Sequence, residues 1–252
     1  MSSANLDNVI ARWVRLGVMF NTAPAARSPD LERLLLDTAR VAGENSRAFI
    51  LAASWLARYG DYVARHRLAR LVGDELEDEH RPALGLLLDW ARERGPANGA
   101  RFNLAIAACR TAVAAAVARP LFDVERRNAT FALLAERRAS DLSRAWRRWA
   151  EDFDVKDDAL RPAEWVAAHN PALADRALTG GDLLASVLAE CADDRNAPVP
   201  SESELARRCG ASRPAVRDAI RRLRLAGRLR TVRRGRANSV EVEAPRAKAR
   251  DR

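Results

Sequence analysis

The sequence predicts a mainly α-helical fold in two parts, with one small β-hairpin close to the C-terminal end. Ala, Leu and Arg, which favour helices, dominate the 252 residues, while β-branched residues are sparse. Apolar residues recur at spacings of three and four through the first 190 residues. No alternation typical of a strand, longer than about four residues, comes before Arg228.

The first part, residues 1–178, is expected to be an all-helical domain of ten helices. Ser28 and Pro29 are expected to cap and begin the second helix, while Gly95-Pro96 and Arg119-Pro120 end others. The predicted helices are Asn5–Phe20, Pro29–Ala42, Asn45–Arg58, Asp61–Val72, Glu75–Arg94, Ala100–Ala118, Val124–Arg138, Ser140–Asp152, Pro162–Ala168 and Ala172–Leu178.

Composition narrows the class of protein. No apolar run approaches the roughly 18–20 residues that cross a bilayer, and the N-terminus lacks the apolar core of a signal peptide, so we expect a cytoplasmic protein without membrane contact. The three cysteines, Cys109, Cys191 and Cys209, are far apart and include no C-x-x-C pair. We expect them to be buried small hydrophobic residues, with no disulfide framework and no metal site.

Motifs for catalysis are missing. The sequence contains no H-E-x-x-H, G-x-S-x-G, P-loop or dinucleotide-binding glycine pattern. We therefore expect a protein that is not an enzyme and needs no cofactor.

The positive charge is concentrated near the C-terminus. Residues 179–252 carry 17 basic against 10 acidic residues, while residues 1–178 carry 26 against 24. Within residues 213–236 ten arginines accompany one acid, Asp218. A cluster of one sign needs counter-charge, and phosphate is the commonest large source. Every aromatic residue lies at or before Trp165, so this segment offers no platform for stacked bases, which favours duplex DNA over single strands.

The second part, residues 179–243, begins with two predicted helices. The first covers about Asp182–Ala192, and a polar connector with prolines follows over Asp193–Pro200. Ser201 and Glu204 have the spacing of a capping box, in which each side chain satisfies a backbone donor of the other residue. Gly210 and Ala211 then form a turn of the length used in helix-turn-helix motifs.

The third predicted helix, 212–226, has one apolar and one basic stripe. Ser212 is its expected N-cap, and Pro214 lies in the first turn, where its missing N–H is harmless. The apolar stripe is Val216, Ala219, Ile220 and Leu223, and the opposite stripe is Arg213, Arg217, Arg221 and Arg224. Such a helix suits the major groove, where arginine pairs bidentately with guanine.

A hairpin and a tail complete the chain. After Gly227, a predicted helix C-cap, strands are expected over Arg228–Arg233 and Ser239–Glu243, with a basic tip over 234–238 between them. Such a wing typically touches the DNA backbone or enters the minor groove. Residues 244–252 are expected to be a basic, disordered tail.

The stretch PVPSESELARRCGASRPAVRDAIRRLRLAGRL resembles the winged helix-turn-helix of the GntR superfamily. That family shows a P-S-E-x-E-L-A opening, a G-x-S-R-x-x-V-R-x-A-x-x-x-L recognition helix and an R-x-G-R-like wing. The matching residues are Pro200, Ser201, Glu202, Glu204, Leu205, Ala206, Gly210, Ser212, Arg213, Val216, Arg217, Ala219, Leu223, Gly227, Arg234, Gly235 and Arg236. The likeness covers about 60 residues. GntR regulators place this module first, whereas here it comes last, so only the mode of DNA binding is carried over.

The resemblance implies a sequence-specific, double-stranded DNA-binding transcriptional regulator, a repressor that acts as a homodimer on a two-fold site. Helix 212–226 would enter the major groove, and the wing, 233–238, would lie on the backbone or in the minor groove. The expected DNA-binding residues are Ser201, Ser212, Arg213, Pro214, Arg217, Arg221, Arg224, Arg233, Arg234, Gly235 and Arg236.

The role of residues 1–178 stays open at this stage. This domain would dimerise the chain and sense a signal, or it would bind a partner protein, as in an autoregulating antitoxin or a scaffold. Two further readings are a helical enzyme targeted to DNA, with His66 or His169 at its centre, and a winged helix that binds protein in place of DNA.

Overall fold

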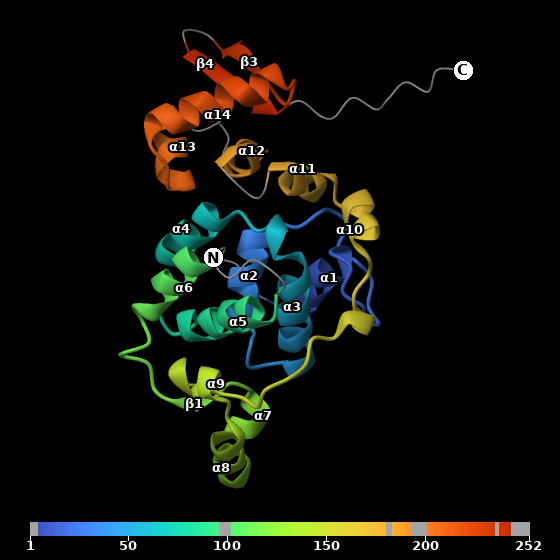
Figure 1. The fold of residues 1–252 in the computed structure, drawn as a ribbon, viewed down its shortest axis with the longest axis vertical. Coiled ribbons are helices and arrows are strands. Elements are labelled where there is room, and N and C mark those ends of the chain that lie inside the picture. Colours follow the sequence, from blue (N-terminus) through green and yellow to red (C-terminus); the bar gives the residue numbers. More distant parts are fainter. Residues whose placement is uncertain (1–4, 96–101, 180–182, 193–200, 235–236, 243–252) are drawn as a thin grey trace, which may run out of the picture.

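The computed structural model describes residues 5–95, 102–179, 183–192, 201–234 and 237–242. Helices dominate these ranges, in keeping with the predicted fold class (Figure 1). The expected connector over 193–200, the tail over 244–252 and two residues of the expected wing tip, Gly235 and Arg236, lie outside the described residues.

The N-terminal body, residues 5–179, contains eleven α-helices and two 3-10 helices among its described residues. The α-helices are α1 (Leu6–Arg15), α2 (Leu31–Arg40), α3 (Ser46–Tyr59), α4 (Arg65–Glu75), α5 (Arg81–Arg94), α6 (Asn103–Arg110), α7 (Asp123–Arg126), α8 (Ala129–Arg138), α9 (Asp141–Ala145), α10 (Ala163–His169) and α11 (Pro171–Thr179). The 3-10 helices are η1 (Gly60–Tyr62) and η2 (Asp157–Ala159).

Several expected helix boundaries in the body are wrong. The N-cap of α2 is Asp30, which accepts a hydrogen bond from the Arg33 backbone, whereas the Ser28 hydroxyl donates to Asn170. The segment expected as one helix over Val124–Arg138 is two, because the side chain of Asn128 caps a new start. The helix expected to reach Ala118 ends at Arg110.

Two very short strands also depart from expectation. β1 (Arg119–Pro120) pairs in parallel with β2 (Arg148–Trp149), although no strand was predicted before residue 228. Two residues are too few for any alternation of side chains to be visible in the sequence. This pairing replaces the second half of the helix expected over Ser140–Asp152.

The body packs around buried tryptophans. Trp13 and Trp55 meet edge to face, with ring centroids 5.5 Å apart, and their indole N–H groups donate to Thr38 and to the Leu16 carbonyl. Trp146 packs against the backbone of Gly85 on α5, where a Cβ would lie 2.1 Å from the ring. The indole N–H groups of all three tryptophans are hydrogen-bonded, that of Trp146 to Asp89.

The C-terminal unit, residues 183–242, has a core of its own. It contains α12 (Leu183–Ala192), α13 (Glu202–Cys209), α14 (Arg213–Leu225) and an antiparallel hairpin of β3 (Leu229–Arg234) and β4 (Ala237–Val242). The hydrophobic core of the body ends at Leu173, and a second core begins at Leu184. The unit lies at one end of the molecule, with α8 at the other end (Figure 1).

No helix among the described residues is both long enough and apolar enough to cross a membrane.

Candidate nucleic-acid interface

Three helices of the C-terminal unit share a small apolar core. The buried side chains come from one side of each helix, at the helical spacing that the sequence shows. They are Leu184, Val187 and Cys191 of α12, Leu205, Ala206 and Cys209 of α13, and Val216, Ala219, Ile220 and Leu223 of α14. Leu229, the first residue of β3, joins this core and so fixes the hairpin to the helices.

The turn between α13 and α14 depends on one glycine. Gly210 ends α13 with φ of +62°, in the left-handed region that favours glycine, and Ser212 then caps α14 by accepting a hydrogen bond from the Ala215 backbone. These two features set the direction in which α14 leaves the turn.

The expected capping box at the start of α13 forms only in half. Ser201 accepts a hydrogen bond from the backbone of Glu204, as expected. The Glu204 carboxylate turns instead to Arg207 and Arg208, at 2.7 and 2.6 Å, and their hydrogen bonds lower its pKa to about 2. A charged partner competes better for this carboxylate than the backbone N–H does.

The arginines of α14 form an exposed stripe. Arg213, Arg217, Arg221 and Arg224 are all exposed in the whole chain, so the body does not cover them. With 3.6 residues per turn, their centre lies roughly 100° around the helix axis from the buried stripe. They flank the buried face and do not lie opposite it, which corrects the expected placement. Arg222 is exposed on the other flank, roughly 150° from the arginine stripe.

Two arginines of the stripe hold acidic partners. Arg217 donates to Glu202 on α13 at 3.0 and 3.2 Å, and Arg221 donates to Asp218 at 2.6 Å. Both arginine side chains are about two-thirds exposed, at 66% and 68%, so these pairs contribute only about 0–1 kcal/mol to stability. Within the described residues no ion pair is found for Arg213 or Arg224. A phosphate or a base edge can therefore replace the carboxylates at little cost.

The hairpin follows α14 directly. The C-cap of α14 is Ala226, one residue before the predicted Gly227, which follows it with φ of +65°. β3 and β4 pair antiparallel from Leu229 with Val242 to Arg234 with Ala237. The strands begin and end within two residues of their expected bounds. Arg233 and Arg234 are the last residues of β3, next to the tip.

The C-terminal unit rests on the body through a buried ionic network. Arg67 of α4, which has no solvent exposure, donates to Asp30, Glu32 and Glu190 at 2.6 to 2.8 Å. Glu190 belongs to α12, and Glu32 also accepts from Arg176 of α11 at 2.6 Å. One guanidinium thus joins carboxylates of the body and of the C-terminal unit.

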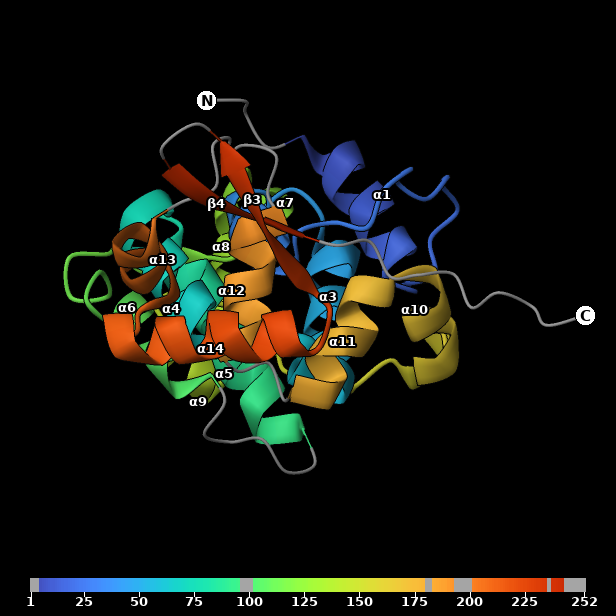
Figure 2. The ribbon, with the colours of Figure 1, turned by 90° about the horizontal axis from the view of Figure 1, so that it is seen from above.

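Further contacts extend this junction onto α13. Arg70 donates to Glu190 at 3.3 Å and also to the backbone carbonyl of Arg208. Gly210 lies close to His66, since an added Cβ would meet the His66 carbonyl at 3.7 Å. Figures 1 and 2 show α13 beside α4, while α14 lies farther from the body. The exposed stripe therefore belongs to the helix of this pair that lies farther from the body.

His66 lies on α4 and His169 is the last residue of α10. Burial, with a smaller effect of Arg65, lowers the pKa of His66, and the ring of His169 stacks on Trp165 at 3.8 Å. Among the described residues no group of three or more His, Cys, Asp and Glu is placed to hold a metal ion.

Comparison of the chain with protein-family models, with curated proteins and with solved structures finds no match.

Proposed function

We propose that this protein is a sequence-specific, double-stranded DNA-binding transcriptional regulator and that its C-terminal unit is a winged helix-turn-helix. The observation that carries this proposal is the exposed arginine stripe of α14. It lies on the second helix of a tight helix pair and next to a hairpin. A basic helix presented in this way fits the major groove of B-form DNA.

The proposed contacts divide by position along α14. Arg213 and Arg217, near its N-terminus, would reach base edges, with Pro214 beside them, because recognition helices enter the groove with this end. Arg221 and Arg224 would meet phosphates, as would the Ser201 and Ser212 hydroxyls at the starts of α13 and α14. The wing residues Arg233, Arg234, Gly235 and Arg236 would lie on the backbone or in the minor groove.

The regulator would act as a homodimer and a repressor in the cytoplasm. A two-fold pair of modules reads a two-fold operator, with recognition helices about 34 Å apart. A dimer that covers its own promoter blocks transcription by occupancy alone, without contacting polymerase.

The test is a titration of labelled duplex from the gene's own upstream region with the full chain, beside a scrambled duplex, at two salt concentrations. A preference for the upstream duplex of about 10³ or more supports specific recognition. Equal binding of both duplexes, with steep salt dependence, contradicts it, because phosphate contacts alone give that result.

A second function, binding of a partner protein by the body, is favoured by one observation. Val124 of α7 and Phe131, Leu133 and Leu134 of α8 are all exposed, at 42 to 64%, and α8 projects from the end opposite α14 (Figure 1). Clustered apolar exposure marks interaction surfaces more often than isolated residues do. An antitoxin-like or scaffold role would fit it. A co-transcribed neighbouring gene that is toxic when expressed alone would support that role.

A further inference from the structure

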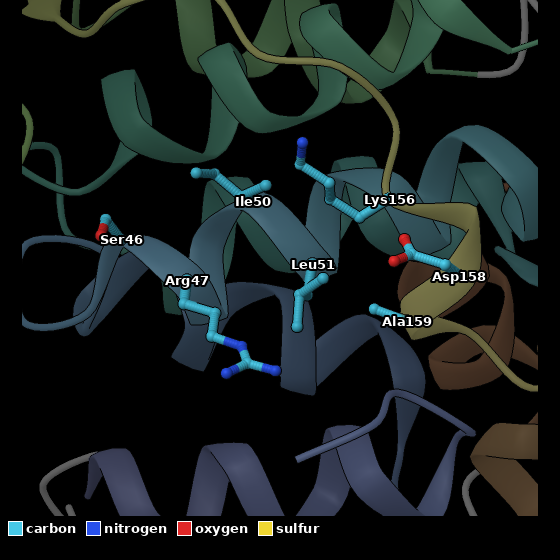
Figure 3. Close-up of a pocket in the computed structure, with 7 residues that line it drawn as sticks. All are labelled: Ser46, Arg47, Ile50, Leu51, Lys156, Asp158 and Ala159. Carbon is cyan, nitrogen blue, oxygen red and sulfur yellow. The ribbon is translucent and has the colours of Figure 1, made fainter.

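An open cleft of about 310 Å³ lies on the body between α3 and residues 156–159, which include η2. Figure 3 shows its lining. The lining residues are Ser46, Arg47, Ile50, Leu51, Lys156, Asp158 and Ala159. Its volume is at the lower end of the range for small-molecule sites, about 300–1,000 Å³.

The walls of this cleft are fixed by hydrogen bonds. The backbone N–H of Lys156 donates to Ser54 of α3 at 3.1 Å, and the Ala159 carbonyl accepts from Met19 at 2.9 Å. Arg58 of α3 pairs with Asp157 at 3.1 Å. The cleft therefore exists before any ligand arrives, which lowers the cost of binding.

The floor of the cleft is apolar. Ile50 and Ala159 are half-buried and Leu51 is buried, so together they offer a hydrocarbon surface. An apolar group seated on this surface would lose contact with water, at about 25 cal/mol for each Å² removed from water.

Two cations flank this apolar floor. The Arg47 guanidinium lies over the Phe20 ring at 5.4 Å, and no carboxylate pairs with it among the described residues. The Lys156 ammonium likewise has no hydrogen bond or ion pair in that part of the chain. Both cations can therefore pair with a carboxylate that a ligand supplies.

One acid, Asp158, also lines the cleft. Figure 3 shows Asp158 on the same side of the cleft as Lys156 and Ala159, between these two residues and across from the α3 side chains. The lining therefore carries a net charge of +1, and it would accommodate one anionic group more readily than several.

We propose that this cleft binds a small amphipathic anion, such as a medium-chain or aryl carboxylate. The apolar part of the ligand lies on Ile50, Leu51 and Ala159. Its carboxylate pairs with the Lys156 ammonium, and the Arg47 guanidinium adds a second favourable charge. The proposal does not rest on DNA binding by the C-terminal unit.

The test uses decanoate as the probe, below its micelle concentration, with the full chain and no DNA. Calorimetry gives the dissociation constant, and a pulse of an acetylating reagent followed by mass spectrometry gives the reactivity of each amine. Lys248 is the only other lysine of the chain, so its acetylation is an internal reference. We expect saturable binding that protects Lys156 from acetylation and leaves Lys248 unchanged.

Variants and a neutral analogue separate the contribution of charge to binding from the contribution of apolar contact. Lys156→Met is expected to weaken decanoate binding about tenfold, and the matched Lys248→Met to leave it unchanged. Decanol should bind at least tenfold more weakly than decanoate. Ile50→Gln should also weaken binding, because it removes part of the apolar floor while the charges remain.

Three results would each overturn the proposal. The first is that decanoate shows no saturable binding at 1 mM, roughly the weakest affinity that counts as specific. The second is that Lys156→Met binds decanoate as tightly as the wild type does. The third is that decanoate protects both lysines equally from acetylation. Because no DNA is present, each of these results leaves the proposed DNA binding untouched.

Discussion

At the scale of single residues, Arg217 joins the two helices of the proposed DNA-binding motif. Its guanidinium donates to Glu202, and under the proposed function it would exchange this carboxylate for a base edge. Arg217→Ala is expected to cost about 1–3 kcal/mol on the preferred duplex and to relax specificity at one base pair. Titration of the preferred duplex and its single-base variants measures both effects.

The matched control for this variant is Arg222→Ala. Arg222 has the same charge on the same helix but lies on the other flank of α14, so its loss should change affinity far less. If Arg217→Ala weakens random and preferred duplexes equally, Arg217 touches only phosphate.

Removal of the Glu202 charge is expected to change DNA binding in the opposite direction to removal of Arg217. Its carboxylate pairs with Arg217 and also places a negative charge beside the proposed DNA-binding face. Glu202→Gln is expected to tighten DNA binding roughly two- to fivefold at low salt, since an exposed ion pair amounts to about 0–1 kcal/mol. In the Arg217→Ala background most of this gain should disappear. Equal gains in both backgrounds would show that Glu202 acts only through general repulsion.

At the scale of the elements, the turn between α13 and α14 requires a residue that adopts a positive φ. Gly210 adopts a φ of +62°, and a Cβ would meet only ordinary contacts there, so backbone strain alone sets the cost of a side chain. Gly210→Ala is expected to destabilise the protein by about 1–2 kcal/mol. Thermal unfolding of the variant measures this change.

Gly73→Ala is the matched control for the turn glycine. Gly73 lies inside α4 with open space around its Cα, so alanine there is expected to stabilise the protein by about 0.5–1 kcal/mol. The two substitutions should thus shift the melting temperature in opposite directions. A stabilising Gly210→Ala would mean that the turn is not left-handed in solution.

The predictability of each element follows from how local its determinants are. Ser201, Ser212, Gly210 and Gly227 act on their immediate neighbours, and the ends of α13 and α14 accordingly lie within one residue of where the sequence predicts them. The start of α2 was misplaced because Ser28 is engaged by Asn170, 142 residues away. Competition of that kind leaves no local pattern to read.

The candidate interface shows the same limit. The sequence predicts the arginines of α14 and their exposure, because both follow from spacing along one helix. The pairing of Arg217 with Glu202, and the preference of Glu204 for Arg207 and Arg208, depend on side-chain geometry in three dimensions. The cleft near Lys156 was missed because α3 and η2 are about a hundred residues apart.

At the scale of the whole molecule, the network around Arg67 is expected to make the protein less stable at acid pH. Burial raises the pKa of Asp30, but the hydrogen bonds and charge of Arg67, with Arg33, outweigh it and place the pKa below the ordinary 3.8. The stabilisation is therefore complete above about pH 4 and is lost as the pH falls from there towards the folded pKa.

Asp30→Asn tests this pH dependence. The variant is expected to be less stable than wild type near neutral pH, and to lose less stability than wild type between about pH 4 and pH 2. Urea unfolding at a series of pH values compares the two slopes. Parallel curves for the two proteins would assign the acid sensitivity to other carboxylates.

We expect the same network to couple the unfolding of the C-terminal unit to that of the body. Glu190 is the carboxylate that α12 contributes, and Arg67, Arg70 and Arg208 surround it. Buried cysteines lie in both cores: Cys109 in the body, and Cys191 and Cys209 in the C-terminal unit. Burial raises the pKa of each thiol to about 12. A thiol in this state reacts with alkylating reagents only when its surroundings open.

Glu190→Gln leaves three arginines at the junction without this charge, and truncating one member of a buried ionic network costs about 3–5 kcal/mol. Iodoacetamide labelling at pH 8, resolved by peptide mass spectrometry, should then accelerate at least tenfold at Cys191 and Cys209, and far less at Cys109. Glu77→Gln, which removes an exposed carboxylate paired with Arg40, should change none of the three rates. Equal acceleration at all three cysteines would mean that the two cores unfold as one cooperative body and that the junction does not separate them.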